Sequence, residues 1–121
     1  MSGLFSMIVG RAKRSKYGAI RAKVDGITFA STREAHRYSE LKLLERAGKI
    51  RGLRIQPMFP IVVNGEQVCI YRADFQYEEF VIRGFKWELV VEDVKGFKTE
   101  VYKLKKKLLL TTQGIEIKEV R

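Results

Sequence analysis

The sequence predicts an α/β domain with a mixed β-sheet of about four to five strands and two flanking helices. Two pairs of β-prone runs surround the dipeptides Asp25-Gly26 and Asn64-Gly65, which supply the backbone angles that tight hairpin turns need. Between these pairs, residues 32–47 carry apolar side chains at helical spacing. These observations predict the order hairpin, helix, three strands, helix, strand.

The first helix is expected at about residues 32–47. Ser31 followed three residues later by Glu34 forms a capping-box pattern at its start, and Gly48 suits the left-handed position after its last turn. The apolar positions along it are Ala35, Tyr38, Leu41 and Leu44. This is the firmest local feature of the sequence.

The second hairpin is predicted from MFPIVV, the Asn64-Gly65 turn and QVCIYRADFQY. Pro57 and Pro60 indicate that its first strand is irregular or at an edge. The segment FKWELVVEDVKG predicts a long strand that is apolar on both parities and therefore central in the sheet. The last strand is GIEIKEV.

A second, amphipathic helix is expected in TEVYKLKKKLLLTTQG. Its predicted apolar stripe is Val101, Leu104 and Leu108. Its predicted basic stripe is Lys103, Lys106 and Lys107.

The length of 121 residues fits one domain, which we place at residues 17–121 behind a basic arm at residues 1–16. The net charge is +10, and residues 1–24 contain six basic residues and no acid. Such an excess favours a polyanionic partner, since lysine and arginine speed the encounter with phosphate backbones and release counterions on binding.

The composition also excludes several classes. The single cysteine, Cys69, excludes an internal disulfide and a cysteine-based zinc site within one chain. No apolar run approaches the length of a membrane span. The stretch Leu4–Val9 is too short for a secretory signal and lacks basic residues before it. We therefore expect a soluble, cytoplasmic protein.

The chemistry is expected around ADF (residues 73–75) and EDVKG (residues 92–96). Side chains two apart on a strand share a face, so Asp93 and Lys95 are predicted to project together. Asp93 can ligate a divalent cation, while Lys95 can orient a water or stabilise charge on phosphoryl oxygens. Asp74, on the preceding strand, offers a second oxygen ligand of the kind that magnesium prefers.

These motifs resemble those of the PD-(D/E)xK nucleases, and among them the small phage endonucleases and Holliday-junction resolvases. The likeness covers about residues 17–121, with an S-x-x-E helix start, ADF and VEDVKG. It implies a restriction-endonuclease-like core and a site of Glu34, Asp74, Asp93 and Lys95. It also implies Mg²⁺, with Mn²⁺ as a substitute, held by Glu34, Asp74 and Asp93, with the Val94 carbonyl as a further ligand.

The sequence departs from the family pattern at two positions. Ala73 stands where the family name has proline, and Asp93 stands where glutamate is commoner. The motif is loose, and its weight comes from its place on the predicted strands between the two predicted helices.

Each site residue also has a structural interpretation. Glu34 closes a capping box, and Asp93 with Lys95 can form an ion pair without catalytic role. Glu92 is expected on the opposite face of the strand, and would replace a ligand if the strand were bulged. Glu40 is expected to be solvated, and would replace Glu34 if the helix register were shifted. His36, the one histidine, is expected to be exposed or in weak contact with DNA.

Basic side chains on either side of this site are expected to hold the DNA backbone. After the site they are Lys98, Lys103, Lys105, Lys106 and Lys107. In the N-terminal arm they are Arg11, Lys13, Arg14 and Lys16. For both sets, the alternative is a solvated surface.

The function expected from the sequence is metal-dependent hydrolysis of DNA phosphodiesters. The resemblance implies a homodimer that cuts branched DNA in phage recombination, replication or packaging, in the host cytoplasm. The alternatives are a nuclease of the same fold with nicking or other specificity, and a DNA-binding module without catalysis.

Overall fold

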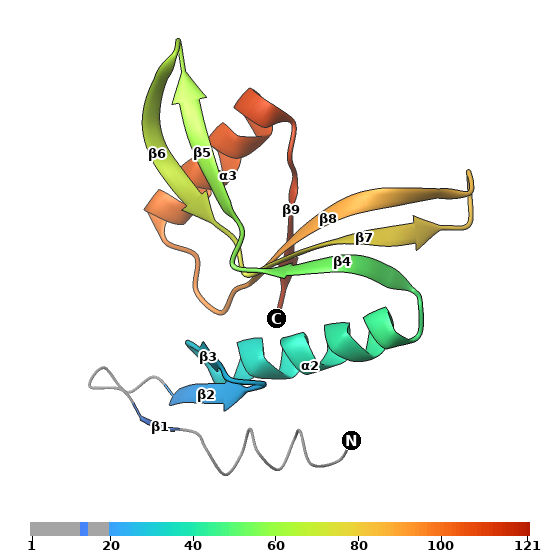
Figure 1. Cartoon of the computed structure of the whole chain (residues 1–121). Helices are drawn as coiled ribbons and strands as arrows, with labels where there is room; N and C mark the ends of the chain where they lie inside the picture. Colours follow the sequence, from blue (N-terminus) through green and yellow to red (C-terminus); the bar gives the residue numbers. More distant parts are fainter. Residues whose placement is uncertain (1–12, 15–19) are drawn as a thin grey trace. The chain divides into compact units, whose positions relative to one another are not determined.

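The computed structural model describes residues 13–14 and 20–121 (Figure 1). The chain divides into two compact units, one up to Ala47 and one at Gly48–Arg121. Lys13 and Arg14 form β1 (Lys13–Arg14), which pairs antiparallel with β2. Arg11, Lys16 and the predicted boundary between the arm and the domain lie outside the described residues.

The first unit contains the predicted hairpin and helix. β2 (Ile20–Val24) and β3 (Ile27–Phe29) pair through a turn in which Asp25 and Gly26 have φ of 51° and 77°. α2 (Thr32–Arg46) begins at Ser31, whose side chain accepts a hydrogen bond of 3.1 Å from the Glu34 N–H. The helix packs on the hairpin, and the rings of Tyr38 and Phe29 lie 5.2 Å apart.

The second unit contains a four-stranded mixed sheet in the order β4-β7-β8-β9. Its strands are β4 (Ile50–Ile55), β7 (Phe75–Val81), β8 (Lys86–Val94) and β9 (Ile117–Val120). β7 is antiparallel to both β4 and β8, whereas β9 is parallel to β8. The α/β class, the mixed sheet and the inner position of β8 therefore agree with the predictions.

A separate hairpin in this unit consists of β5 (Met58–Val63) and β6 (Glu66–Arg72). Asn64 and Gly65 form its turn with positive φ, as predicted, and a register shift after Ile61 makes β5 irregular. α3 (Glu100–Gln113) lies against this hairpin (Figure 1). Buried residues from both sheets and from α3 form the core of the unit: Ile61, Tyr71, Ala73, Val91, Tyr102, Leu109 and Ile117.

The predicted order of three strands between the helices is wrong, because five strands lie there. β4 was missed because Gly52, with φ of 65°, sits at a register shift that disrupts the alternation of its side chains. The run QVCIYRADFQY is two strands, broken at Ala73-Asp74. The chain leaves the four-stranded sheet between β4 and β5 and returns to it between β6 and β7. The two connecting segments lie side by side, because the Ala73 N–H donates to Pro57 O at 3.1 Å and the Gln56 N–H donates to Asp74 O at 2.8 Å.

Two of the three positions of the apolar stripe predicted for the last helix are wrong, while the third, Leu108, packs against the core as predicted. Tyr102 and Leu109 are buried, whereas Val101 and Leu104 are 62% and 60% exposed. More than one set of apolar positions in this lysine-rich helix could face the core. The set that does so contains Tyr102, whose hydroxyl also has a polar partner, Glu119.

In the described part of the chain, no helix is long and apolar enough to cross a lipid bilayer.

Candidate active site

Asp93 and Lys95 lie at the C-terminal end of β8 and project to the same face, as strand alternation predicted. The Lys95 Nζ is 3.3 Å from Asp93 Oδ1. Asp93 is only 1% exposed, while the Lys95 side chain is 26% exposed. The site is therefore a buried carboxylate with a partly exposed amine beside it.

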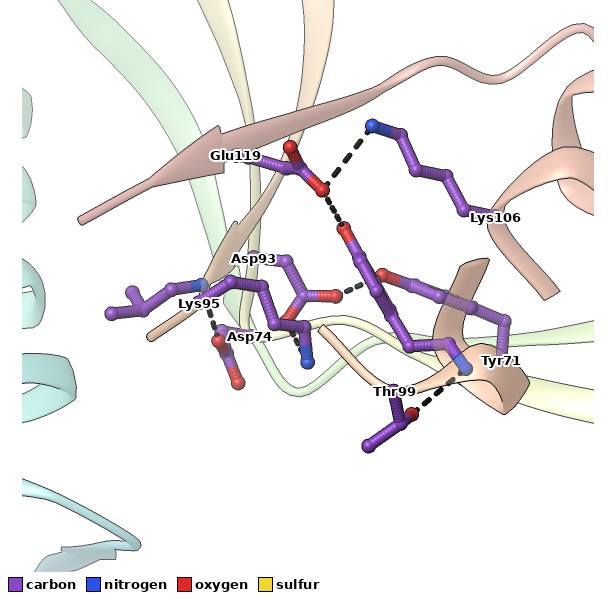
Figure 2. A network of polar contacts seen from close by, with 9 residues as sticks. Tyr71, Asp74, Asp93, Lys95, Thr99, Lys106 and Glu119 are labelled. Atoms are coloured by element: carbon purple, nitrogen blue, oxygen red, sulfur yellow. Dashed lines mark hydrogen bonds and ion pairs between the residues drawn. The ribbon is translucent and has the colours of Figure 1, made fainter. Parts of the chain in front are cut away.

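Asp74 lies in the short segment that connects β6 to β7, next to the same end of β8. Its N–H donates to Glu92 O at 3.1 Å, and its Oδ2 accepts a hydrogen bond of 2.7 Å from the Val94 N–H. Val94 stands between Asp93 and Lys95, so the structure brings together three of the four predicted site residues (Figure 2). The break at Ala73-Asp74, absent from the prediction, is what turns Asp74 towards this end of the sheet.

Tyr71 is a site residue that sequence reasoning missed. Its hydroxyl donates a hydrogen bond to Asp93 Oδ2, so Asp93 is held by the phenol on one oxygen and by Lys95 on the other (Figure 2). Burial raises the pKa of Tyr71, and the hydrogen bond to Asp93 raises it further. Tyr71 therefore stays protonated and acts as a fixed donor to the carboxylate.

Glu119 was missed too, and it lies beside the site because β9 pairs in parallel with β8, which places Asp93 opposite Glu119. Its carboxylate accepts a hydrogen bond of 2.7 Å from the Tyr102 hydroxyl. Lys98 Nζ lies 2.9 Å from one oxygen and Lys106 Nζ 3.3 Å from the other. The hydrogen bond from Lys98, followed by that from Tyr102, lowers the pKa of Glu119 to about 2.

Tyr102 contacts both Glu119 and Lys95, the amine that pairs with Asp93. The Lys95 Nζ lies 4.4 Å from the centre of its ring, a cation–π contact, and the Tyr71 ring is 6.2 Å away. Burial raises the pKa of Tyr102, and the hydrogen bond to Glu119 raises it further. Tyr102 therefore helps to position Lys95 while its own hydroxyl is held by Glu119.

The other acidic candidates lie elsewhere. Glu34 is half-buried at the start of α2 in the first unit, so its place at this site stays a prediction. Glu40 is exposed and lies 3.6 Å from Arg37. Glu92 is fully buried and accepts a hydrogen bond from the Tyr77 hydroxyl of the neighbouring strand β7, whereas Asp93, on the other face of β8, accepts one from Tyr71. His36 is exposed, as expected.

The predicted DNA-binding lysines separate into two groups. A pocket of about 370 Å³ beside α3 and β9 is lined by four of them: Lys98, Lys103, Lys106 and Lys107. Lys105 instead donates to Ile70 O at 3.1 Å, on the side of the helix that faces β6. The pocket also includes Tyr102 and Glu119, so it adjoins the candidate site.

The donor atoms here suit a hard cation. Asp74 and Asp93 supply carboxylate oxygens, and neither histidine nor cysteine contributes, a chemistry that favours Mg²⁺ or Mn²⁺ over Zn²⁺. Among residues 13–14 and 20–121, no group of three or more histidine, cysteine or acidic side chains is arranged to hold a metal. A cation at this strand end would have the carboxylates of Asp74 and Asp93 as its protein ligands, and Mg²⁺ held there would retain several waters.

Comparisons with known proteins give one family. A search of curated proteins found no match, and a search of solved structures also found none. One family model matches residues 14–120, nearly the whole chain, and its description is "Protein of unknown function (DUF1064)". This match covers both units and the whole candidate site, and the chain belongs to the DUF1064 family.

Proposed function

We propose that this protein is a Mg²⁺-dependent DNA endonuclease of the PD-(D/E)xK type, with a restriction-endonuclease-like core. One observation carries the proposal: Asp74 bonds the backbone of Val94 at the strand end where Asp93 and Lys95 share a face. Burying the Asp93 carboxylate beside apolar strands is costly, so keeping it there next to the partly exposed amine of Lys95 fits a chemical role better than a structural one. The order of helix, mixed sheet, helix and parallel last strand is compatible with this fold.

In this proposal, Asp74 and Asp93 hold the cation. Mg²⁺ held there would supply Lewis-acid chemistry, lowering the pKa of water and offsetting negative charge on the phosphoryl oxygens. Lys95 orients the attacking water and stabilises the negative charge that develops in the transition state. Tyr71 keeps the Asp93 carboxylate in one orientation by donating to it, and Tyr102 positions the amine of Lys95.

DNA is the proposed substrate because of the charge around the site. The chain carries a net charge of +10, and four lysines line the pocket beside Tyr102 and Glu119. We further propose a cytoplasmic homodimer that cuts branched DNA, since two symmetric sites match a symmetric junction. Phage recombination, replication or packaging are the processes in which such an enzyme would act.

The test is cleavage of matched linear, nicked, flap and four-way DNA substrates in Mg²⁺ and in Mn²⁺. Wild-type protein is expected to cut, while Asp74→Ala and Lys95→Ala abolish cutting and leave binding largely unchanged. Glu40→Ala, an exposed acid on α2, is the control expected to cut normally. Binding without cutting in either metal overturns the proposal.

A DNA-binding module without catalysis is the second candidate. It is favoured by the pairing of Lys95 with Asp93 and by the absence of a three-ligand cluster among the described residues. The same assay separates the two candidates, because a binding module leaves every substrate intact. A nuclease with nicking specificity would instead cut one strand of the linear duplex.

A further inference from the structure

We infer that the pocket beside α3 and β9 binds one unpaired nucleotide of the DNA strand next to the scissile phosphodiester. The inference rests on the proposed function in that it takes DNA as the partner. It adds a binding site and a substrate class, namely DNA with a single-stranded segment at the cut.

The size and lining of the pocket support a nucleotide as its occupant. Its volume of about 370 Å³ lies within the roughly 300–1,000 Å³ of small-molecule sites. Apolar surface is supplied by Leu110, Ile117 and the ring of Tyr102, while the lysine amines supply positive charge. A nucleotide has the same two-part character, with an apolar base face and sugar next to an anionic phosphate.

The charge of the pocket favours an anion even though two glutamates line it. Glu119 engages Lys98 and Lys106, and Lys103 lies 3.2 Å from Glu100. Within the described part of the chain, Lys107 has no ion-pair partner, so its charge is available to a phosphate. With four lysines and two glutamates, the lining keeps a net positive charge.

The position of the pocket links it to the proposed chemistry. Tyr102 and Glu119 belong to the pocket, Lys95 lies against the Tyr102 ring, and Asp93 is opposite Glu119 on the paired strands. A strand with its scissile phosphodiester at Asp93 and Lys95 therefore has the pocket directly beside it. In a fully paired duplex the neighbouring base is stacked, so filling the pocket requires an unpaired nucleotide.

The first experiment maps binding on the full chain by NMR, in EDTA so that nothing is cut. The probes are thymidine 5′-monophosphate, thymidine and inorganic phosphate. The monophosphate is expected to shift the amide signals of Leu110 and Ile117 as well as those of the lysines, and to bind more tightly than either part alone. Identical shifts and affinities for the monophosphate and for inorganic phosphate overturn the inference, because they indicate an unspecific anion site.

The second experiment uses two matched variants, Leu110→Asp and Leu104→Asp. Both leucines are exposed on α3, 48% and 60% respectively, but only Leu110 lines the pocket. Leu110→Asp is expected to weaken binding of an overhang duplex roughly tenfold relative to Leu104→Asp, with a much smaller difference for the blunt duplex. Equal losses in the two variants overturn the inference, since both add the same charge.

The outcomes separate this inference from the proposed function. If nucleotide binding is sensitive to Leu110→Asp but the wild-type protein cuts no substrate, the inferred nucleotide site stands and the proposed nuclease function fails. If the protein cuts DNA and Leu110→Asp changes cleavage of no substrate, the nuclease function stands and the inferred nucleotide site fails.

Discussion

The Asp74 carboxylate accepts a hydrogen bond of 2.7 Å from the backbone N–H of Val94, and this contact anchors Asp74 at the end of β8. Asp93 and Lys95 are the two neighbours of Val94 in the chain. The Asp74 carboxylate is therefore bonded to the backbone segment that carries both Asp93 and Lys95.

Tyr71→Phe and Tyr77→Phe form a matched pair for testing which face of β8 is functional. Tyr71 donates to Asp93 and Tyr77 to Glu92, and all four residues are almost fully buried. Each substitution is expected to lower the free energy of unfolding by about 1–3 kcal/mol, because a buried carboxylate loses a donor. Urea denaturation measures this loss.

Only Tyr71→Phe is expected to slow cleavage, by roughly tenfold or more, because only Tyr71 orients a proposed metal ligand. Cleavage rates at a saturating Mg²⁺ concentration check this. Full activity in Tyr71→Phe, or an equal loss in Tyr77→Phe, contradicts the assignment of the functional face.

Glu119 is expected to make the stability of the second unit sensitive to acid. Its pKa in the folded protein is about 2, against an ordinary value of 4.5, so the carboxylate stabilises the fold above pH 4.5. That contribution is lost as the pH falls from about 4.5 towards 2. Urea midpoints across this range are expected to fall less steeply for Glu119→Gln than for the wild type.

Glu116→Gln is the control for this experiment, since Glu116 is an exposed carboxylate near the start of the same strand. It is expected to follow the wild-type acid profile. An unchanged slope in Glu119→Gln would show that the contacts with Lys98 and Tyr102 do not stabilise the fold.

Tyr38 is expected to make the stability of the first unit fall at alkaline pH. Burial, followed by the hydrogen bond of 2.9 Å to Asp25 Oδ2, raises the pKa of Tyr38 from 10.0 to about 12. The raised pKa favours the protonated form in the folded state, so its contribution is present below pH 10 and is lost as the pH rises through 12. Tyr38→Phe is expected to cost about 1 kcal/mol at neutral pH and to remove this part of the alkaline loss.

Circular dichroism melts of both proteins at neutral and alkaline pH measure the effect. The prediction fails if the stability difference between wild type and Tyr38→Phe stays constant up to pH 12.

Lys107→Ala and Lys105→Ala test which side of α3 faces DNA. Lys107 lines the pocket, whereas the amine of Lys105 donates to Ile70 O on β6. Lys107→Ala is expected to reduce the slope of log binding constant against log salt by about 0.7–0.9, the range for one lost phosphate contact on single-stranded or duplex DNA. Lys105→Ala is expected to change it less, and the reverse order would place the DNA on the other side of the helix.

Local patterns were sufficient for the elements whose geometry depends on near neighbours. The turns at Asp25-Gly26 and Asn64-Gly65, the cap at Ser31 and the shared face of Asp93 and Lys95 follow from backbone preferences and strand alternation. These features were predicted from the sequence and are present in the structure.

Features that depend on distant pairing were beyond such patterns. The register shift at Gly52 disrupts the side-chain alternation by which β4 could have been predicted. The break between β6 and β7 at Ala73-Asp74 depends on hydrogen bonds to Pro57 and Gln56, which are distant in the sequence. Glu119 joins the site only through the parallel register of β9 with β8, for which no sequence signal exists. Tyr71 follows the alternation of β6, but its contact with Asp93 depends on how that hairpin packs against the sheet.

The most direct test of the central claim is a crystal of the full chain soaked in manganese chloride, with anomalous scattering used to locate the ion. A peak is expected within roughly 2.0–2.2 Å of carboxylate oxygens from both Asp74 and Asp93. A manganese ion bound only elsewhere, or density that leaves Asp74 and Asp93 without a cation at saturating manganese, would contradict it.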